Sequence, residues 1–320
     1  MPYTHIKLNC GIFDFSLKKV SFQAKYGVCL FEPNGNSVIA NTNQSLVAYD
    51  ENLKIKWERG PLDIHHQIEK SKFADQLLMV TSRYMPSRDF GLIRYDELLV
   101  FSGNGTLVKS FSFADYFKKY PQAVVGLPQI NGWTTYNHER KTYEVNHGNS
   151  FTELYSVKDG KRVFTGYIFN CIAQQKIYIF DTELKSIVKE IRTRKHLHTV
   201  RQYDEDHVVA YENAEEVGQT SSIQLISLKD GRYSTLYESK NPLLSSVACS
   251  SVQVLPEDKL FIVHSNCSSP KNGKDLEGYY LEFVDLRQKK SFAYHIEAGF
   301  ARQNGELINA ETYLKKNIGQ

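Results

Sequence analysis

One short motif recurs along this chain: an apolar strand, a turn, and a second strand that opens on a polar or basic residue. Its copies read LVAYDENLKIKWE, LLVFSGNGTLVKSFSF, IYIFDTELKSIVKEI, LISLKDGRYSTLYE and LEFVDLRQKKSFAYHI. Such strand–turn–strand patterns are typical of β-hairpins. The turns lie about 50 residues apart, with one longer interval, and are marked by Asp50, Gly103, Asp181, Asp230 and Asp285. A repeat of this length corresponds to one four-stranded blade of a β-propeller.

A second repeated element precedes the hairpins. The segment HTVRQYDEDHVVAY, which begins at His198, aligns without gaps with SSVQVLPEDKLFIV, which begins at Ser250. Longer versions begin at His66 and His147. Helical periodicity is nearly absent, and ADYFKKYPQ is the one plausible short helix. The chain is therefore expected to be all-β.

The repeats predict a single domain over residues 1–320, a six-bladed β-propeller. We place five blades at 27–60, 63–113, 143–191, 196–238 and 248–297. The two chain ends, 298–320 with 1–26, are predicted to form the sixth blade. Ring closure by the N- and C-terminal segments would remove the exposed sheet edges of an open array.

The charge pattern bears on the class of partner. The chain has 39 Lys and Arg against 36 Asp and Glu, a net charge of +3, and its basic residues are scattered. No patch typical of nucleic-acid binding is seen, so a small neutral or anionic partner, such as an aromatic or phenolic substrate, is expected.

The sequence also bears on compartment. No apolar run approaches the ~20 residues of a transmembrane helix, and the N-terminus lacks a basic segment followed by an apolar one. The five cysteines form no CxxC pair, so free thiols are expected rather than a disulfide framework or a zinc site. As it stands, the sequence predicts a cytoplasmic protein; a chain from which a signal peptide has been removed would be periplasmic.

Three histidines occupy one position of the repeat. The first strand of each propeller blade lines the central channel, and His66, His147 and His198 each open such a strand. Repeat symmetry is therefore expected to bring them together, although they are far apart in sequence. Asn149, two residues after His147, shares its face and can both donate and accept hydrogen bonds.

Other polar residues at strand ends or in blade loops are candidates for binding an anion. A guanidinium can clamp a planar or tetrahedral anion with two hydrogen bonds, which makes the arginines near these ends of interest. A solvated surface position is the alternative for each of them. The candidate anion- or substrate-binding residues are Arg83, Arg194, Arg302, Ser250 and Asn213.

At these residues the chain resembles the bacterial arylsulfate sulfotransferases. The resemblance covers roughly residues 20–300 and depends on an ordered set of short motifs. These are His65-His66-Gln67-Ile68 in the second blade, His147-Gly148-Asn149-Ser150 in the third, and Leu197-His198-Thr199 followed by Asn213. The early segment KYGVCLFEPNGNSVIANTNQSLVAYDENLKIKWE is similar to that family's first blade.

The resemblance implies an enzyme that moves a sulfuryl group from one phenolic ester to another phenol through a sulfated histidine, with no nucleotide sulfate donor and no cofactor. Carried over by position, His198 would be the nucleophile. His66, His147 and Asn149 would hold the sulfuryl oxygens. A neutral imidazole is a good nucleophile near pH 7, and donors aimed at the oxygens would stabilise the charge that develops.

One position departs from the family. The family has an arginine on the strand after the His-x-Asn motif, where this chain has Asn170, Cys171 or Ile172. Loss of a charged donor to the transferring group costs about 3 kcal/mol of transition-state stabilisation. Three interpretations stay open: Arg83 or Arg194 substitutes, the acceptor chemistry has changed, or activity is lost.

Two other classes of function remain open. Three histidines could instead hold a catalytic Zn²⁺ or Fe²⁺ through His66, His147 and His198. A propeller can also be a non-catalytic binding or assembly platform, because fold does not fix function.

Overall fold

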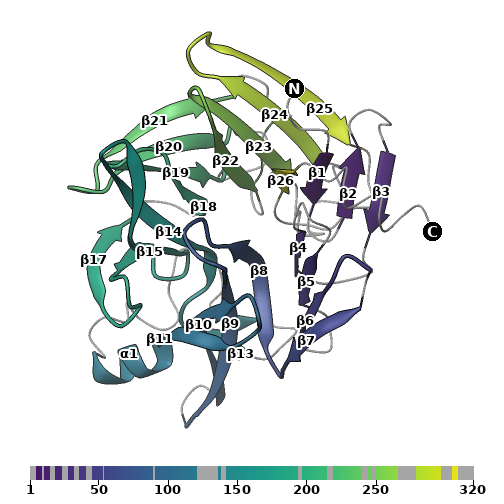
Figure 1. The fold of residues 1–320 in the computed structure, drawn as a ribbon. Helices are drawn as coiled ribbons and strands as arrows, with labels where there is room; N and C mark the ends of the chain where they lie inside the picture. The colour runs from purple at the N-terminus through teal and green to yellow at the C-terminus, as the bar shows by residue number, and fades with distance from the viewer. Residues whose placement is uncertain are drawn as a thin grey trace. The chain divides into compact units, whose positions relative to one another are not determined.

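The structure, a computed structural model, is made almost entirely of strands. It describes residues 5–8, 11–14, 19–23, 28–31, 36–40, 45–52, 54–88, 91–120, 136–137, 142–193, 197–214, 219–239, 244, 246, 250–265, 279–296 and 305–308. In this part of the chain there are strands β1–β26 and one helix, α1 (Figure 1). The prediction of a repeat-like all-β protein is confirmed.

Contacts divide the chain into two compact units. The first comprises Met1–Thr42, Val47–Glu58 and Leu197–Gln320, and the second comprises Asn43–Leu46 and Arg59–His196. Each unit is built from whole sheets, apart from the sheet of residues 28–59, which the boundary divides.

Four sheets belong wholly or mostly to the first unit. Three of them run in chain order, like the up-and-down sheet of a propeller blade. The first is β4 (Val28–Phe31), β5 (Ser37–Ala40), β6 (Leu46–Tyr49) and β7 (Ile55–Arg59). The second is β18 (Leu197–Gln202), β19 (His207–Glu212), β20 (Ser222–Ser227) and β21 (Tyr233–Glu238). The third is β22 (Ser251–Leu255), β23 (Lys259–Ser265), β24 (Tyr279–Asp285) and β25 (Lys290–Ile296).

The fourth sheet joins the two ends of the chain. Its order is β26 (Gly305–Ile308), β1 (His5–Leu8), β2 (Gly11–Asp14) and β3 (Lys19–Gln23). β26 pairs antiparallel with β1, and His5 lies opposite Ile308. A closed ring of six blades stays a prediction.

The second unit contains two sheets. One is again in chain order: β14 (Gly148–Lys158), β15 (Lys161–Cys171), β16 (Lys176–Phe180) and β17 (Ile187–Arg192). The other has β8 (Asp63–Lys70), β9 (Gln76–Ser87), β10 (Gly91–Ser102) and β11 (Leu107–Ser112), extended by β13 (Thr142–Glu144) and β12 (Tyr136–Asn137). The first half of β10 pairs with β13 in parallel, and its second half pairs with β11. Residues 143 and 144, which the sequence placed in the following blade, thus belong to this sheet.

Aspartates build the repeated turns. Asp50 Oδ1 accepts hydrogen bonds from the backbone N–H groups of Asn52 and Lys54, and Asp181 Oδ1 accepts from those of Glu183 and Lys185. A side chain that caps its own turn in this way fixes the chain reversal. Asp230 and Asp285 make similar bonds within their turns.

The short helix predicted at ADYFKKYPQ is confirmed as α1 (Phe113–Lys119). Ser112 caps its N-terminus, because the Ser112 hydroxyl accepts a hydrogen bond from the Asp115 N–H. Phe113 and Phe117 enter the core of the second unit with Phe169, Tyr178 and Phe180. The first unit has its own core, which includes Tyr211, Val252, Leu260, Ile262 and Val284.

Two cysteines behave differently. Cys171 is a buried free thiol, as expected, and burial raises its pKa to about 12. Cys29 is disulfide-bonded, which corrects the expectation of a free thiol at this position. In the described part of the chain, no helix is long and apolar enough to cross a membrane.

Candidate functional site

The first strands of three successive sheets each contain a register shift at or next to a predicted site residue. In β8 the register slips between His65 and Ile68, so His66 and Gln67 are inserted residues, and His66 has a φ of 66°. In β14 the inserted residue is Asn149. In β18 it is Thr199, next to His198, with a φ of 37°. Bulges redirect side chains and are common beside active sites, so the three candidate strands share a local device.

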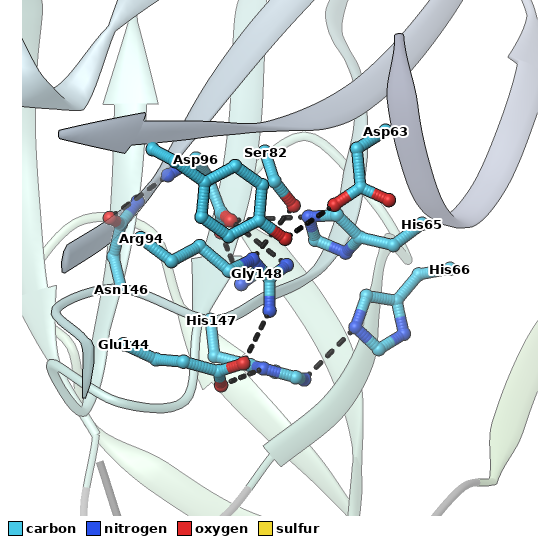
Figure 2. Close-up of polar contacts among 11 residues, drawn as sticks. Asp63, His65, His66, Ser82, Arg94, Asp96, Glu144, Asn146, His147 and Gly148 are labelled. Atoms are coloured by element: carbon cyan, nitrogen blue, oxygen red, sulfur yellow. Dashed lines mark hydrogen bonds and ion pairs between the residues drawn. The ribbon is translucent and has the colours of Figure 1, made fainter. Parts of the chain in front are cut away.

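His66 and His147 are brought together in the second unit. Their Nε2 atoms lie 3.0 Å apart, and His147 Nδ1 lies 2.8 Å from Glu144 Oε2 (Figure 2). Because a carboxylate only accepts, His147 Nδ1–H donates to Glu144. A neutral His147 then accepts at Nε2, and His66 Nε2–H donates to it. The result is a carboxylate–imidazole–imidazole chain.

A buried arginine fixes the carboxylate end of this chain. Arg94 donates to Glu144 Oε1 at 2.7 Å and to the Ser82 hydroxyl at 2.7 Å, and its side chain is 5% exposed. The contact arises because Arg94 of β10 lies opposite Glu144 of β13 in the parallel pairing. Burial raises the pKa of Glu144, but the hydrogen bond from His147 and the charge of Arg94 outweigh it. The pKa of this carboxyl lies well below its usual range.

A second buried carboxyl, Asp96, supports the start of β14. It accepts a hydrogen bond from the Gly148 N–H at 2.6 Å and contacts His65 Nε2 at 3.1 Å and Arg94 at 3.3 Å. Its own N–H donates to the Asn146 side chain. Burial raises the pKa of Asp96 to about 6, although the charges of Arg94 and His147 oppose this. Burial lowers the pKa of His65 well below its usual value, and Arg94 adds to this effect.

Two asparagine side chains are buried without hydrogen-bonding partners among the described residues. Asn149 is 2% exposed and Asn213 is 5% exposed, and in each the oxygen and the nitrogen of the amide are both unpaired. Burial of an unpaired amide is costly, so such groups call for an explanation by water or by a ligand. Both residues were predicted as site residues from the sequence.

His198 belongs to the first unit and is buried. It lies opposite Tyr211 in the ladder between β18 and β19. The next residue, Thr199, donates its hydroxyl proton to the backbone oxygen of Ser250 at 3.1 Å. The first unit thus contains three buried residues that the sequence predicted for the site: His198, Ser250 and Asn213. The second unit contains the other three, His66, His147 and Asn149.

The predicted arginines are not part of the histidine cluster. Arg83 lies in a separate network, where it donates to Glu97, Ser112 and Asp115. Arg194 and Arg302 lie outside the described residues. At the position where the sequence resemblance predicts an arginine, β15 ends in buried Asn170 and Cys171.

Sequence reasoning missed Arg94, Asp96 and Glu144. Arg94 and Asp96 alternate along β10, as outward polar residues also do, so nothing local marks them as buried. The one available signal was Glu144, three residues before His147, a spacing that lets a carboxylate meet an imidazole.

The cluster is suited to binding anions and moving protons. Two imidazole nitrogens lie within hydrogen-bonding distance of each other, and an ionised carboxylate holds one ring in a fixed tautomer. Among the described residues, no group of three or more His, Cys, Asp and Glu side chains is placed to hold a metal ion.

Compared with protein-family models and with curated proteins, the chain matches none. Solved structures that it resembles include the dihydro-heme d1 dehydrogenase NirN, at 13% identity and a TM-score of 0.43, with 93% of this chain and 55% of that chain covered. The WD40 β-propeller domain of Doa1 is 8% identical, with coverage of 91% and 78% and a TM-score of 0.46. The β-propeller domain of Cps50 (Swd1) from Myceliophteria thermophila is 8% identical, with coverage of 94% and 88% and a TM-score of 0.46. Likenesses of this size transfer no function to this chain.

Proposed function

We propose that this protein is an enzyme that moves a sulfuryl group from one phenolic ester to another phenol through a histidine intermediate, without a nucleotide donor. The observation that carries the proposal is the pair of buried asparagine amides with no partner among the described residues, Asn149 and Asn213. An unpaired amide N–H is suited to the oxygens of a tetrahedral anion. Each of these amides belongs to a motif that resembles the arylsulfate sulfotransferases.

The proposal gives each residue a role. His198 attacks sulfur, and the bond between sulfur and the phenol oxygen breaks. His66, His147 and Asn149 donate to the sulfuryl oxygens, with Ser250 and Asn213 as further polar partners. These roles require the strand starts to meet around one axis, so a closed ring of six blades is part of the proposal.

The chain of Arg94, Glu144 and His147 supports a fixed orientation of the His147 ring at the proposed sulfuryl site. Arg94 donates to Glu144 Oε1, and Glu144 Oε2 accepts from His147 Nδ1–H at 2.8 Å. In the proposal, this contact directs His147 Nε2 away from the carboxylate and toward the sulfuryl oxygens.

The test is incubation of the purified full chain with phenyl sulfate and a phenol acceptor. We expect transfer of the sulfuryl group and, before acceptor is added, an acid-labile gain of one SO₃ on His198. His198→Ala should abolish both. His207→Ala is the matched control, because His207, the first residue of β19, is a partly exposed histidine that pairs with Asp204. No phenol release and no labelled histidine would refute the proposal and leave a non-catalytic binding platform.

A further inference from the structure

A second chain of buried polar side chains lies in the first unit. The Tyr211 hydroxyl on β19 is 3.0 Å from His264 Nδ1 on β23, and His264 Nε2 is 3.0 Å from Glu282 Oε2 on β24. The exposed fractions of Tyr211, His264 and Glu282 are 0%, 3% and 0%. The other oxygen of Glu282 accepts from the Tyr237 hydroxyl at 2.5 Å.

The Glu282 carboxylate determines where the protons of these hydrogen bonds lie. The Glu282 carboxylate only accepts, so His264 Nε2–H donates to it. Among the described residues, His264 is the group within ion-pair distance that can balance the buried Glu282 charge. The pair is neutral overall when His264 carries both ring protons, and Nδ1–H then donates to the Tyr211 oxygen. When His264 is neutral, Nδ1 instead accepts the Tyr211 proton, so the chain can store or release one proton.

The Tyr211 end of this hydrogen-bonded chain lies beside the start of β18 and the residue that precedes β22. Tyr211 lies opposite His198 in the ladder. Burial raises the pKa of Tyr211, and the Ser221 and Ser250 hydroxyls, which are close enough to interact with its oxygen, oppose this rise. Ser250 immediately precedes β22 and aligns in sequence with His198, the proposed nucleophile. Thr199 Oγ1 ties the two strand starts together through the Ser250 carbonyl. In this sheet a serine backed by a buried Tyr–His–Glu chain therefore takes the repeat position that histidines occupy in the preceding sheets.

We propose that Ser250 is the proton donor and acceptor for the phenol oxygen in the proposed transfer, with Tyr211, His264 and Glu282 as the positioning residues of a proton relay. This inference rests on the proposed function. It assigns the acid–base step, which the sulfuryl-binding residues leave open.

The transfer has two half-reactions, and one proton moves along the relay in each. As the bond from His198 to sulfur forms, the S–O ester bond breaks and its electron pair goes to the phenol oxygen. That oxygen takes the Ser250 hydroxyl proton, Ser250 takes the Tyr211 proton, and Tyr211 takes the His264 Nδ1 proton. In the second half-reaction the acceptor phenol attacks sulfur, the N–S bond breaks, and the acceptor proton returns along the same chain to His264.

Tyr237 provides a matched control for a structural role. It contacts the same carboxylate as His264, but from β21, the last strand of its sheet, and through the other carboxylate oxygen. A network that only stabilises the core predicts similar effects for Tyr211→Phe and Tyr237→Phe. A relay predicts a catalytic effect for Tyr211→Phe alone.

The test compares two donors in the full-length protein. Phenyl sulfate needs a proton on its leaving oxygen, whereas 4-nitrophenyl sulfate has a much better leaving group. We expect Tyr211→Phe to lower kcat with phenyl sulfate about 100-fold, as loss of general acid catalysis does, and to change kcat with 4-nitrophenyl sulfate by less than about threefold. Ser250→Ala should behave likewise, and Tyr237→Phe should resemble the wild type. An equal loss with both donors, or an equal loss in Tyr237→Phe, would overturn the relay.

A readout that is independent of turnover separates this inference from the proposed function. NMR of the exchangeable protons should show His264 Nε2–H in a strong hydrogen bond to Glu282, and Glu282→Gln should weaken this bond and shift the signal of the Tyr211 hydroxyl proton. If wild type transfers no sulfuryl group, the proposed function fails and the NMR result decides whether the relay exists. Signals of the His264 ring and of the Tyr211 hydroxyl proton that are unchanged in Glu282→Gln would refute the relay.

Discussion

At the scale of single residues, Asp96 has an unusual effect on stability. Its pKa is raised by burial from 3.8 to about 6. Between these pH values the folded protein binds a proton that the unfolded chain does not, so this group makes folding more favourable as pH falls from about 6 toward 4. The shift of the Asp96 pKa from 3.8 to about 6 corresponds to roughly 3 kcal/mol in the free energy of unfolding.

Asp96→Asn should remove this dependence. Urea unfolding at pH 7 and pH 4 should show that the wild type gains roughly 2–3 kcal/mol relative to the variant on acidification. The variant keeps an oxygen for the Gly148 N–H, so the comparison isolates the proton. An identical change of both proteins with pH would contradict the prediction.

Glu144 should show the opposite sign. Its pKa is depressed in the folded protein, so its contribution is complete above the unfolded value of 4.5 and is lost as pH falls below it. At pH 7, Glu144→Gln should destabilise the protein by about 3 kcal/mol, because the nearly buried Arg94 loses the nearer of its two carboxylate partners.

The matched comparison for this variant is Glu97→Gln. Glu97 pairs with Arg83 near the surface, so its loss should cost less than about 1 kcal/mol in the same urea unfolding experiment. Equal costs for the two variants would show that Glu144 has no special structural role.

At the scale of elements, the sequence predicted those turns, strands and helices that short local patterns determine. Asp-containing turns, alternating strands and the helix at Phe113–Lys119 have short-range signals, and the structure contains each of them. The parallel pairing of β13 with β10 has no such signal, because a strand of three residues carries no periodicity. The contact between Arg94 and Glu144 was therefore invisible to sequence reasoning, although the contact between His66 and His147 was expected from the repeat.

The bulges were also beyond prediction. His66 and Thr199 adopt positive φ values that side chains with a Cβ rarely adopt, so local preference opposes them. Only the surrounding sheet can enforce such a conformation, and this cost is typical of functional sites.

The hairpin of β14 and β15 offers a paired glycine test. Gly166 has a φ of 150°, and a Cβ there would lie 2.2 Å from the backbone oxygen of Phe180. Gly166→Ala should cost about 3 kcal/mol or more in urea unfolding. Gly160, at the turn of the same hairpin, has a φ of 72° and open space, so Gly160→Ala should cost about 1 kcal/mol. Similar costs at both positions would contradict the role of the close backbone approach.

At the scale of the whole molecule, the sheet of the chain ends is open to test by truncation. Removal of residues 305–320 deletes β26 and leaves β1 as an unpaired edge. Unpaired edges invite association with other chains, so we expect a lower Tm and increased light scattering. Removal of residues 309–320 keeps β26 and should leave both values close to those of the full chain. Identical behaviour of the two truncations would show that the β1–β26 pairing contributes little.

That pairing also constrains the order of events during synthesis. β1 leaves the ribosome before the other described strands, but its partner β26 follows all of them. The sheet that contains β1, β2 and β3 stays incomplete until β26 has been made, while the sheets made from consecutive strands can form as they emerge. A nascent chain of this protein therefore carries an unfinished edge at β1 until β26 emerges, the period in which a chaperone or a neighbouring chain has the longest access to it.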